Sequence, residues 1–216
     1  MFYIRGALAE IRLLIYIERT MQTLHLFPSS IIQTRLSRWE YFKEIYSPFA
    51  DYRFLMKRPD WNCEVKATAG HPAESRIPWD PLLAEVVSIA NTYFDQFAPI
   101  NRIKLRCDEV WLNRYDRKDT QEAHVHIGRE NVLAFAYMVS LPKGSGEFIF
   151  VDSRNDWWAT TIAPKFLQNP PGTSVTPPCE EGTLLIFPAN QQHLVTPHQS
   201  DEPRITISGN LQICNT

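Results

Sequence analysis

The sequence predicts an α+β fold, a β-sandwich or barrel with one sheet covered by helices. Two observations lead to this prediction. In the first half of the chain, apolar residues recur at three and four positions, as they do in amphipathic helices. After Pro99, the chain changes to short alternating or fully apolar runs, which clusters of glycine and proline separate at roughly ten-residue spacing.

Two helices are expected before Pro99. The first covers Leu36 to Tyr46, where aromatic side chains recur at helical spacing. The second opens at Asp80, a good capping residue, followed by Pro81 in the first turn. Its apolar positions continue as far as Phe97. Both helices would pack on one sheet and bury its outer face.

Five strands are expected after Pro99, each an apolar or alternating run bounded by turn residues. They cover residues 104–115, 132–141, 147–151, 183–188 and 204–213. One more strand is expected to open the domain at Leu24 to Pro28. No linker divides the chain, so we expect residues 21–216 to form a single domain.

The first twenty residues are interpreted as an extension of that domain. Their longest uncharged apolar run, Leu13 to Ile17, is shorter than the roughly 7–15 residues of a signal peptide and the roughly 20 of a membrane span. Residues 1–20 are therefore either outside the native chain, with translation starting at Met21, or a loose helix. An ordinary amphipathic first helix is the alternative.

Charge and cysteine content restrict the partners and the compartment. The 216 residues include 22 Lys and Arg against 24 Asp and Glu, a net charge of −2. This balance disfavours nucleic acid and acidic membrane surfaces as partners. The four cysteines form no CxxC motif, so we expect free thiols in a reducing compartment, the cytoplasm.

The histidines provide the sharpest local signal. In His124-Val125-His126, a strand would place both imidazoles on one face, where they can share a metal ion. His193, between two predicted strands, is the candidate for a third ligand. The simpler interpretation is a pair of hydrogen-bonded or surface histidines. His198 lies in a polar loop and is expected to be exposed.

Arg204 opens an alternating strand in which Arg204, Thr206 and Ser208 share one face. An inward arginine is costly unless it meets an anion, and its planar fork fits a carboxylate in bidentate fashion. The alternative is an arginine on an edge strand that forms a surface salt bridge.

Together these segments resemble the core of the Fe(II)/2-oxoglutarate-dependent dioxygenases. The resemblance is closer to a group of oxygenases found in bacteria and their phages, and it covers roughly residues 24–213. It rests on Tyr115, His124-x-His126, Gly146-Glu147-Phe148, Gly182 to Pro188, His193-x-Val195-x-Pro197 and Arg204-Ile205-x-Ile207-Ser208-x-Asn210. The most specific part is the run from Gly182 to Pro188 followed by His193 and Arg204.

The resemblance implies a double-stranded β-helix, a jelly-roll or cupin-like barrel, with Fe(II), 2-oxoglutarate and O₂ at its mouth. His124 and His193 match the two usual histidine ligands. Arg204 matches the residue that grips the distal carboxylate of 2-oxoglutarate. Tyr115, Asn113 and Asn210 are assigned to the remaining polar contacts of that co-substrate.

The third metal ligand departs from the wider superfamily, in which two histidines are joined by one carboxylate. The position of that acid is occupied here by His126. The site is therefore expected to be either a three-histidine site or one completed by Asp152, which follows the strand 147–151.

The implied reaction hydroxylates a substrate while 2-oxoglutarate is decarboxylated to succinate. A protein side chain, a metabolite and a nucleobase all stay open as substrates, and a phage-encoded protein would act in the host cytoplasm. Two alternatives are kept. One is a three-histidine cupin dioxygenase that does not use 2-oxoglutarate. The other is a jelly-roll binding or structural module with a structural metal or none.

Overall fold

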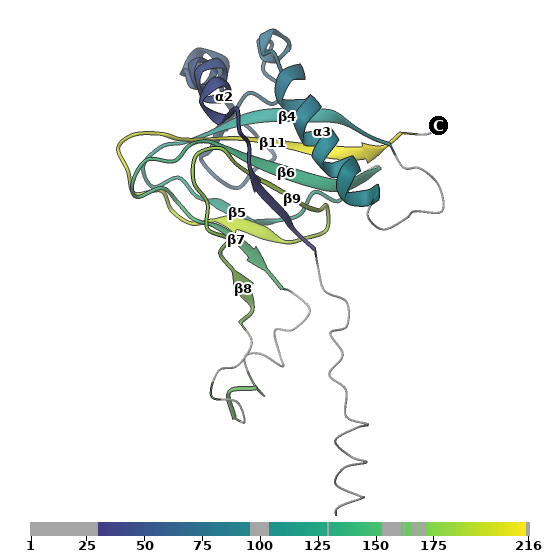
Figure 1. Ribbon diagram of the computed structural model, residues 1–216. Coiled ribbons are helices and arrows are strands. Elements are labelled where there is room, and N and C mark those ends of the chain that lie inside the picture. Colours follow the sequence, from purple (N-terminus) through teal and green to yellow (C-terminus); the bar gives the residue numbers. More distant parts are fainter. Residues whose placement is uncertain are drawn as a thin grey trace, which may run out of the picture.

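Two antiparallel sheets form the centre of the fold (Figure 1). The structure, a computed structural model, describes residues 30–95, 104–128, 130–152, 161, 163–165, 168 and 172–214. The expected extension over residues 1–20 and the expected strand at 24–28 lie outside these residues. The α+β prediction is confirmed. The described strands form two separate sheets rather than a closed barrel.

The large sheet has seven strands in the order β1-β9-β6-β11-β4-β3-β2. These are β1 (Ile32–Arg35), β2 (Met56–Lys57), β3 (Lys66–Ala67), β4 (Leu105–Tyr115), β6 (Asn131–Ser140), β9 (Thr183–Pro188) and β11 (Arg204–Ile213). The small sheet has four strands in the order β5-β10-β7-β8. These are β5 (Gln121–His124), β7 (Phe148–Val151), β8 (Ser174–Val175) and β10 (His193–Val195). All five strands expected after Pro99 are present.

Two helices lie on the outer face of the large sheet (Figure 1). They are α2 (Trp39–Tyr46) and α3 (Asp80–Asp95), and both confirm the sequence prediction. Short 3-10 turns complete the described helical structure at Ser47–Ala50, Tyr52–Phe54, Glu74–Arg76 and Ala163–Lys165. None of the helices described here is long and apolar enough to span a membrane.

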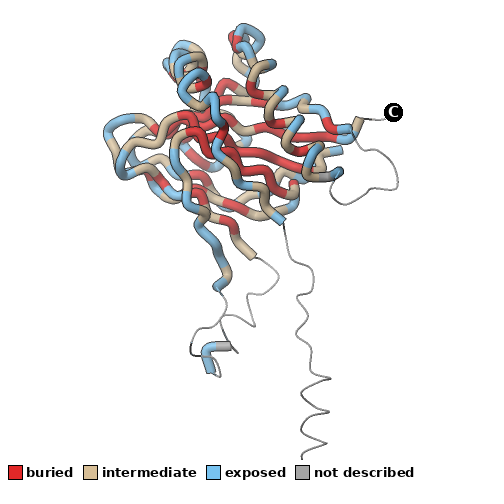
Figure 2. Tube along the Cα trace, viewed as in Figure 1, coloured by how far each residue is buried: buried red, intermediate tan, exposed pale blue. Residues whose placement is uncertain are grey.

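The large sheet is buried on both faces (Figure 2). Alternate residues of β6 show how this is done. Phe135 and Tyr137 belong to the core beneath the helices, whereas Ala134 and Ala136 belong to the core between the two sheets. Because those two side chains are small, they leave open space on the inner face, and Ala136 lines the cavity described below.

Gly182 closes the turn that leads into β9. Its φ is +88°, and a Cβ at this position would lie 2.4 Å from the Cβ of Trp39. We expect Gly182→Ala to lower the free energy of unfolding by about 1–3 kcal/mol, because the turn is left-handed and the space is filled. Urea unfolding measures this loss. Gly128→Ala is the matched control, since nothing lies within 4 Å of its added Cβ. Equal stability of the two variants would contradict the explanation.

Candidate metal centre

Three histidines meet in the structure. His124, His126 and His193 each offer a ring nitrogen, and these atoms lie within 4.8 Å of one another. His124 ends β5 and His193 begins β10, and the two are direct partners in the antiparallel ladder. Partners of this kind point to the same face of a sheet. Their ring centroids are 4.3 Å apart.

His126 lies just beyond the end of β5, so the simple strand geometry expected for the His-x-His motif holds only at His124. Its backbone N–H donates to the carbonyl of Ala189 (2.8 Å), which fastens this segment to the turn after β9. The His126 ring centroid lies 5.3 Å from that of His124 and 5.1 Å from that of His193. Val125 is exposed, as expected for a residue that points away from the group.

Hydrogen bonds at Nδ1 determine which nitrogen of each ring is free. Nδ1 of His124 lies 2.8 Å from the carbonyl oxygen of Glu122, and Nδ1 of His193 lies 2.9 Å from that of Gln191. A carbonyl oxygen can only accept, so Nδ1 of each ring carries the proton and Nε2 carries the lone pair. His126 makes the same kind of bond to Oδ1 of Asn210 at 2.7 Å. All three imidazoles thus offer Nε2 to a metal.

Aromatic side chains shield His126 and His193 from water. Phe148 stacks on His193 with the centroids 5.1 Å apart, Phe187 meets the same ring edge-on at 4.7 Å, and Trp111 stacks on His126 at 5.9 Å. Burial, reinforced by the neighbouring imidazoles, lowers the pKa of His126 to about 4 and the pKa of His193 to about 3. Both rings are neutral at pH 7, which is the form that binds metal.

Arg204 is a buried cation without an anion. Its side chain is 1% exposed, and its Nε and Nη1 atoms have no hydrogen-bond partner among the described residues. Nη2 makes one weak contact with the Met138 sulfur at 3.6 Å, and the guanidinium lies 4.7 Å from the centre of the Tyr115 ring. Strand β11 lies between β6 and β4, so the edge-strand interpretation is wrong. A buried guanidinium that lines a cavity with two unpartnered donors suits an anion such as a carboxylate.

The other residues assigned to the co-substrate divide into two groups. Tyr115 and Asn113 lie on β4 opposite Arg204 and Thr206. Asn113 donates from Nδ2 to Ser208 Oγ at 3.1 Å, while its buried Oδ1 has no partner among the described residues. This oxygen is therefore available to a ligand. Asn210 is different, because both ends of its amide are already engaged.

A single cavity of about 660 Å³ connects the histidines to Arg204. Its lining includes every predicted site residue of β4 and β11, together with Glu109, which the sequence analysis missed. The signal for Glu109 was present in the strand. Residues 109, 111, 113 and 115 alternate along β4 and share the inner face, apart from local irregularity of the strand.

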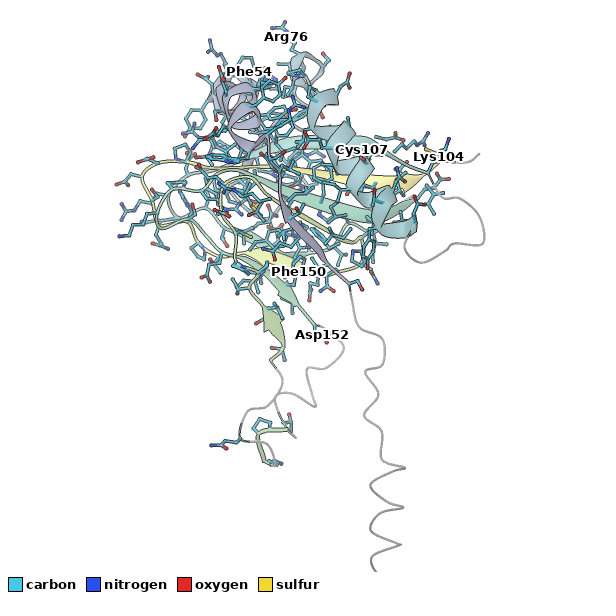
Figure 3. All side chains as sticks on the ribbon, in the orientation of Figure 1. Phe54, Arg76, Lys104, Cys107, Phe150 and Asp152 are labelled. Atoms are coloured by element: carbon cyan, nitrogen blue, oxygen red, sulfur yellow. The ribbon has the colours of Figure 1, made fainter. Side chains whose placement is uncertain are left out.

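Asp152 is not among the grouped side chains. It lies just past the end of β7, beyond Phe150 and away from the large sheet (Figure 3). Within the part of the chain that the structure describes, the three histidines form the one group of potential ligands and no carboxylate joins them. The structure thus places the three-histidine set together and leaves Asp152 apart.

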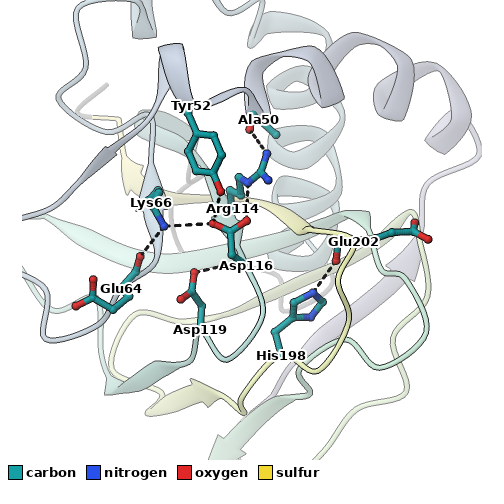
Figure 4. Close-up of polar contacts among 9 residues, drawn as sticks. All are labelled: Ala50, Tyr52, Glu64, Lys66, Arg114, Asp116, Asp119, His198 and Glu202. Carbon is teal, nitrogen blue, oxygen red and sulfur yellow. Dashed lines mark hydrogen bonds and ion pairs between the residues drawn. The ribbon is translucent and has the colours of Figure 1, made fainter.

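His198 is buried, so its predicted exposure is wrong. Its loop packs against the turn after β4. The Lys118 N–H donates to the His198 carbonyl at 2.7 Å, and the His198 N–H donates to the Asp119 carbonyl at 2.9 Å. The same turn is held by Asp116, which accepts hydrogen bonds from Tyr52 and Arg114 (Figure 4). A polar loop sequence did not reveal this packing, and His198 has a structural position outside the metal group.

Comparison with known proteins shows a family to which part of the chain is similar. Residues 109–210 match the family model described as "Putative 2OG-Fe(II) oxygenase". This segment contains all three histidines and Arg204. This match supports an oxidoreductase. Together with the three grouped histidines, it bears out the predicted Fe(II) and 2-oxoglutarate. A search of curated proteins gave no match.

Solved structures agree on the fold. A prolyl-4-hydroxylase from Pseudomonas putida is 12% identical, with a TM-score of 0.57 over 85% of this chain and 92% of that chain. The viral collagen prolyl hydroxylase of Paramecium Bursaria Chlorella virus-1, in complex with 2OG, is 12% identical, with a TM-score of 0.52 over 85% and 96%. The epimerase SnoN with Fe³⁺, alpha ketoglutarate and nogalamycin RO is 14% identical, with a TM-score of 0.55 over 85% and 79%. The double-stranded β-helix prediction is confirmed.

The residues of this site fit the metal and the co-substrate. Three imidazoles with free Nε2 atoms suit a divalent iron and leave coordination positions open for other ligands. The two free donors of Arg204 suit the carboxylate of a dicarboxylic acid. Both features line the same cavity.

Proposed function

We propose that the protein is a dioxygenase that hydroxylates an organic substrate while it converts 2-oxoglutarate into succinate and CO₂. The observation that supports this most is one cavity with three metal-ready imidazoles and a buried guanidinium that lacks an anion. The family match supplies the class of chemistry.

Each residue has a proposed role. His124, His126 and His193 hold Fe(II) through Nε2. Arg204 binds the distal carboxylate of 2-oxoglutarate through its guanidinium, and Tyr115 packs beneath that group. Bound iron and 2-oxoglutarate supply the activation of O₂. The phenylalanine and tryptophan walls exclude water from the reacting atoms.

The buried polar face beside Arg204 orients the co-substrate. Thr206 and Ser208 follow Arg204 on the inner side of β11, and Asn113 bridges them from β4. With its Nδ2 occupied there, Asn113 presents Oδ1 to the cavity. Because buried polar atoms are costly when unpaired, a ligand that fills this region gains from satisfying them.

The two alternatives receive less support. A non-enzymatic jelly-roll module does not explain the family match. A three-histidine dioxygenase that does not use 2-oxoglutarate gives no reason for a buried, unpaired Arg204. Four free cysteines fit the proposed cytoplasmic location, and the net charge of −2 keeps nucleic acid disfavoured as a partner.

Succinate formation tests this proposal. We would supply the protein with Fe(II), 2-oxoglutarate and O₂, and add peptide, metabolite or nucleoside pools separately. One pool is expected to increase succinate release severalfold over the reaction without it, since substrate couples 2-oxoglutarate consumption to hydroxylation. Mass spectrometry of that pool should show addition of one oxygen atom. Bound iron and 2-oxoglutarate with no succinate from any pool would contradict a dioxygenase.

A further inference from the structure

Glu109 is connected to His126 by a chain of two hydrogen bonds. Asn210 Nδ2 donates to Glu109 Oε2 at 2.6 Å, and His126 Nδ1 lies 2.7 Å from Asn210 Oδ1. Glu109 and Asn210 are direct partners across β4 and β11. These two hydrogen bonds thus connect an exposed carboxylate in the middle of β4 to a proposed metal ligand.

The direction of both bonds follows from the chemistry of the groups. An ionised carboxylate can only accept, so the Asn210 amide must turn its NH₂ toward Glu109. Its carbonyl oxygen then faces His126, and this oxygen can also only accept. His126 must therefore carry its proton on Nδ1. The carboxylate at one end of the chain selects the tautomer of the imidazole at the other.

This arrangement separates His126 from its two neighbours. His124 and His193 are each held by a backbone carbonyl only two residues away. Such bonds depend on local chain geometry and not on any side chain. The orientation of His126 depends instead on two side chains that a mutation can remove.

The Glu109 carboxylate bonds to Asn210 and takes part in no ion pair among the described residues. Its neighbour Asp108 is paired with Arg106 at 2.9 Å. Glu109 lines the cavity that holds the three histidines. In the common triad of this chemistry, a carboxylate binds the metal directly. Here the Glu109 carboxylate is connected to the proposed ligand atom, Nε2 of His126, through the Asn210 amide and the His126 ring.

We propose that Glu109 is a positioning residue that sets the tautomer and ring orientation of His126 through Asn210. The proposal rests on the proposed function insofar as His126 is a metal ligand. It also reassigns Asn210, which supports His126 instead of contacting 2-oxoglutarate. Outer partners of metal-bound histidines commonly change metal affinity by about 10- to 100-fold when they are removed.

The main test compares Glu109→Ala with Asp108→Asn, which removes a carboxylate from the adjacent position; both residues are exposed. We expect Glu109→Ala to weaken Fe(II) binding by about 10-fold or more in anaerobic calorimetry. Asp108→Asn should bind as the wild type does. Glu109→Gln should recover most of the affinity, because its amide oxygen can still accept from Asn210. Wild-type affinity in Glu109→Ala would overturn the proposal.

A second measurement needs no metal. In the metal-free protein, ¹⁵N NMR of the imidazoles reports the tautomer of each ring, and Glu109→Ala should reduce the Nδ1–H form of His126 while leaving that of His193 unchanged. An unaltered His126 tautomer would overturn the positioning role. If the wild type bound no iron but this tautomer shift occurred, the proposed function would fail while the hydrogen-bond chain stood.

Asn210→Leu checks that the effect passes through the amide. Once Asn210 is replaced, adding Glu109→Ala should weaken iron binding no further, so the double variant should match Asn210→Leu alone. Full additivity of the two losses would mean that Glu109 acts on the site by another route and would overturn the proposed chain.

Discussion

Arg204→Met is expected to stabilise the metal-free protein and to abolish its stabilisation by 2-oxoglutarate. The buried guanidinium has two donors without partners among the described residues, and only the Tyr115 ring and the Met138 sulfur contact it, so its desolvation is incompletely offset. An unbranched apolar side chain removes that cost. We expect the free energy of unfolding to rise by at least about 1 kcal/mol.

The same substitution at Arg114 provides the control. Arg114 donates to Asp116 at 2.9 Å and to the carbonyl of Ala50 at 2.9 Å. Arg114→Met removes satisfied, charge-assisted bonds, so it should lower stability by about 1–3 kcal/mol. Two arginines on paired strands should therefore respond to one substitution with opposite signs. A clear loss of stability in Arg204→Met would contradict an unpaired charge.

Ligand-linked stability completes this test. With Fe(II) bound under anaerobic conditions, 2-oxoglutarate at 100 times its Kd should stabilise the wild type by about 2.7 kcal/mol. Arg204→Met should gain almost none of this, while its iron affinity stays unchanged. Thermal unfolding with and without 2-oxoglutarate measures both quantities. An undiminished shift in the variant would move the carboxylate site elsewhere.

His193→Ala is expected to abolish Fe(II) binding, with a loss in affinity greater than about 100-fold. Removal of an outer partner already costs about 10- to 100-fold, and His193 is proposed to be a ligand itself. Its ring lies between His124 and His126 on one side and two phenylalanines on the other. No other described side chain of the group can take its place.

Two alanine variants serve as controls for iron binding. His71 bonds its own loop through Nδ1 and lies outside the grouped histidines, so His71→Ala should keep full stoichiometry. Asp152→Ala should also keep it if the three imidazoles suffice. Loss of iron in Asp152→Ala would mean that this carboxylate completes the site, and retention in His193→Ala would exclude His193 as a ligand. Circular dichroism confirms that each variant is folded.

The long helices and strands could be predicted because their apolar, buried residues recur at regular spacing. α3 is amphipathic over sixteen residues, and β6 and β11 are apolar or alternating over ten each. The periodic pattern of such segments is set by the core that they face. Arg204 stood out for the same reason, since a charge inside an apolar strand is informative.

Three short strands of the small sheet, β5, β8 and β10, could not be predicted in the same way, whereas β7 has an apolar run of its own. β5 reads Gln-Glu-Ala-His and has no apolar pattern of its own. It becomes a strand because β10 pairs with it, and β10 is itself only three residues long. The sequence could therefore suggest that His124 and His193 share a metal, but only long-range pairing brings them face to face.

Polar networks were the least predictable part of the site. The family resemblance assigned Asn210 to the polar contacts of the co-substrate. The structure shows its amide shared between His126 and Glu109. Several polar residues of β11 point inward, and contacts with neighbouring strands decide which of them is free to contact the ligand. The sequence of one strand does not contain this information.

The most direct test of the account is an anaerobic titration of the purified protein, first with Fe(II) and then with 2-oxoglutarate, followed by visible absorbance. The account predicts one bound iron per chain and, on addition of 2-oxoglutarate, a metal-to-ligand charge-transfer band that saturates at one equivalent. Arg204→Met should require far more 2-oxoglutarate to reach the same band. Iron binding without any band would contradict 2-oxoglutarate as a ligand of this metal, and the absence of iron binding would contradict the three-histidine centre.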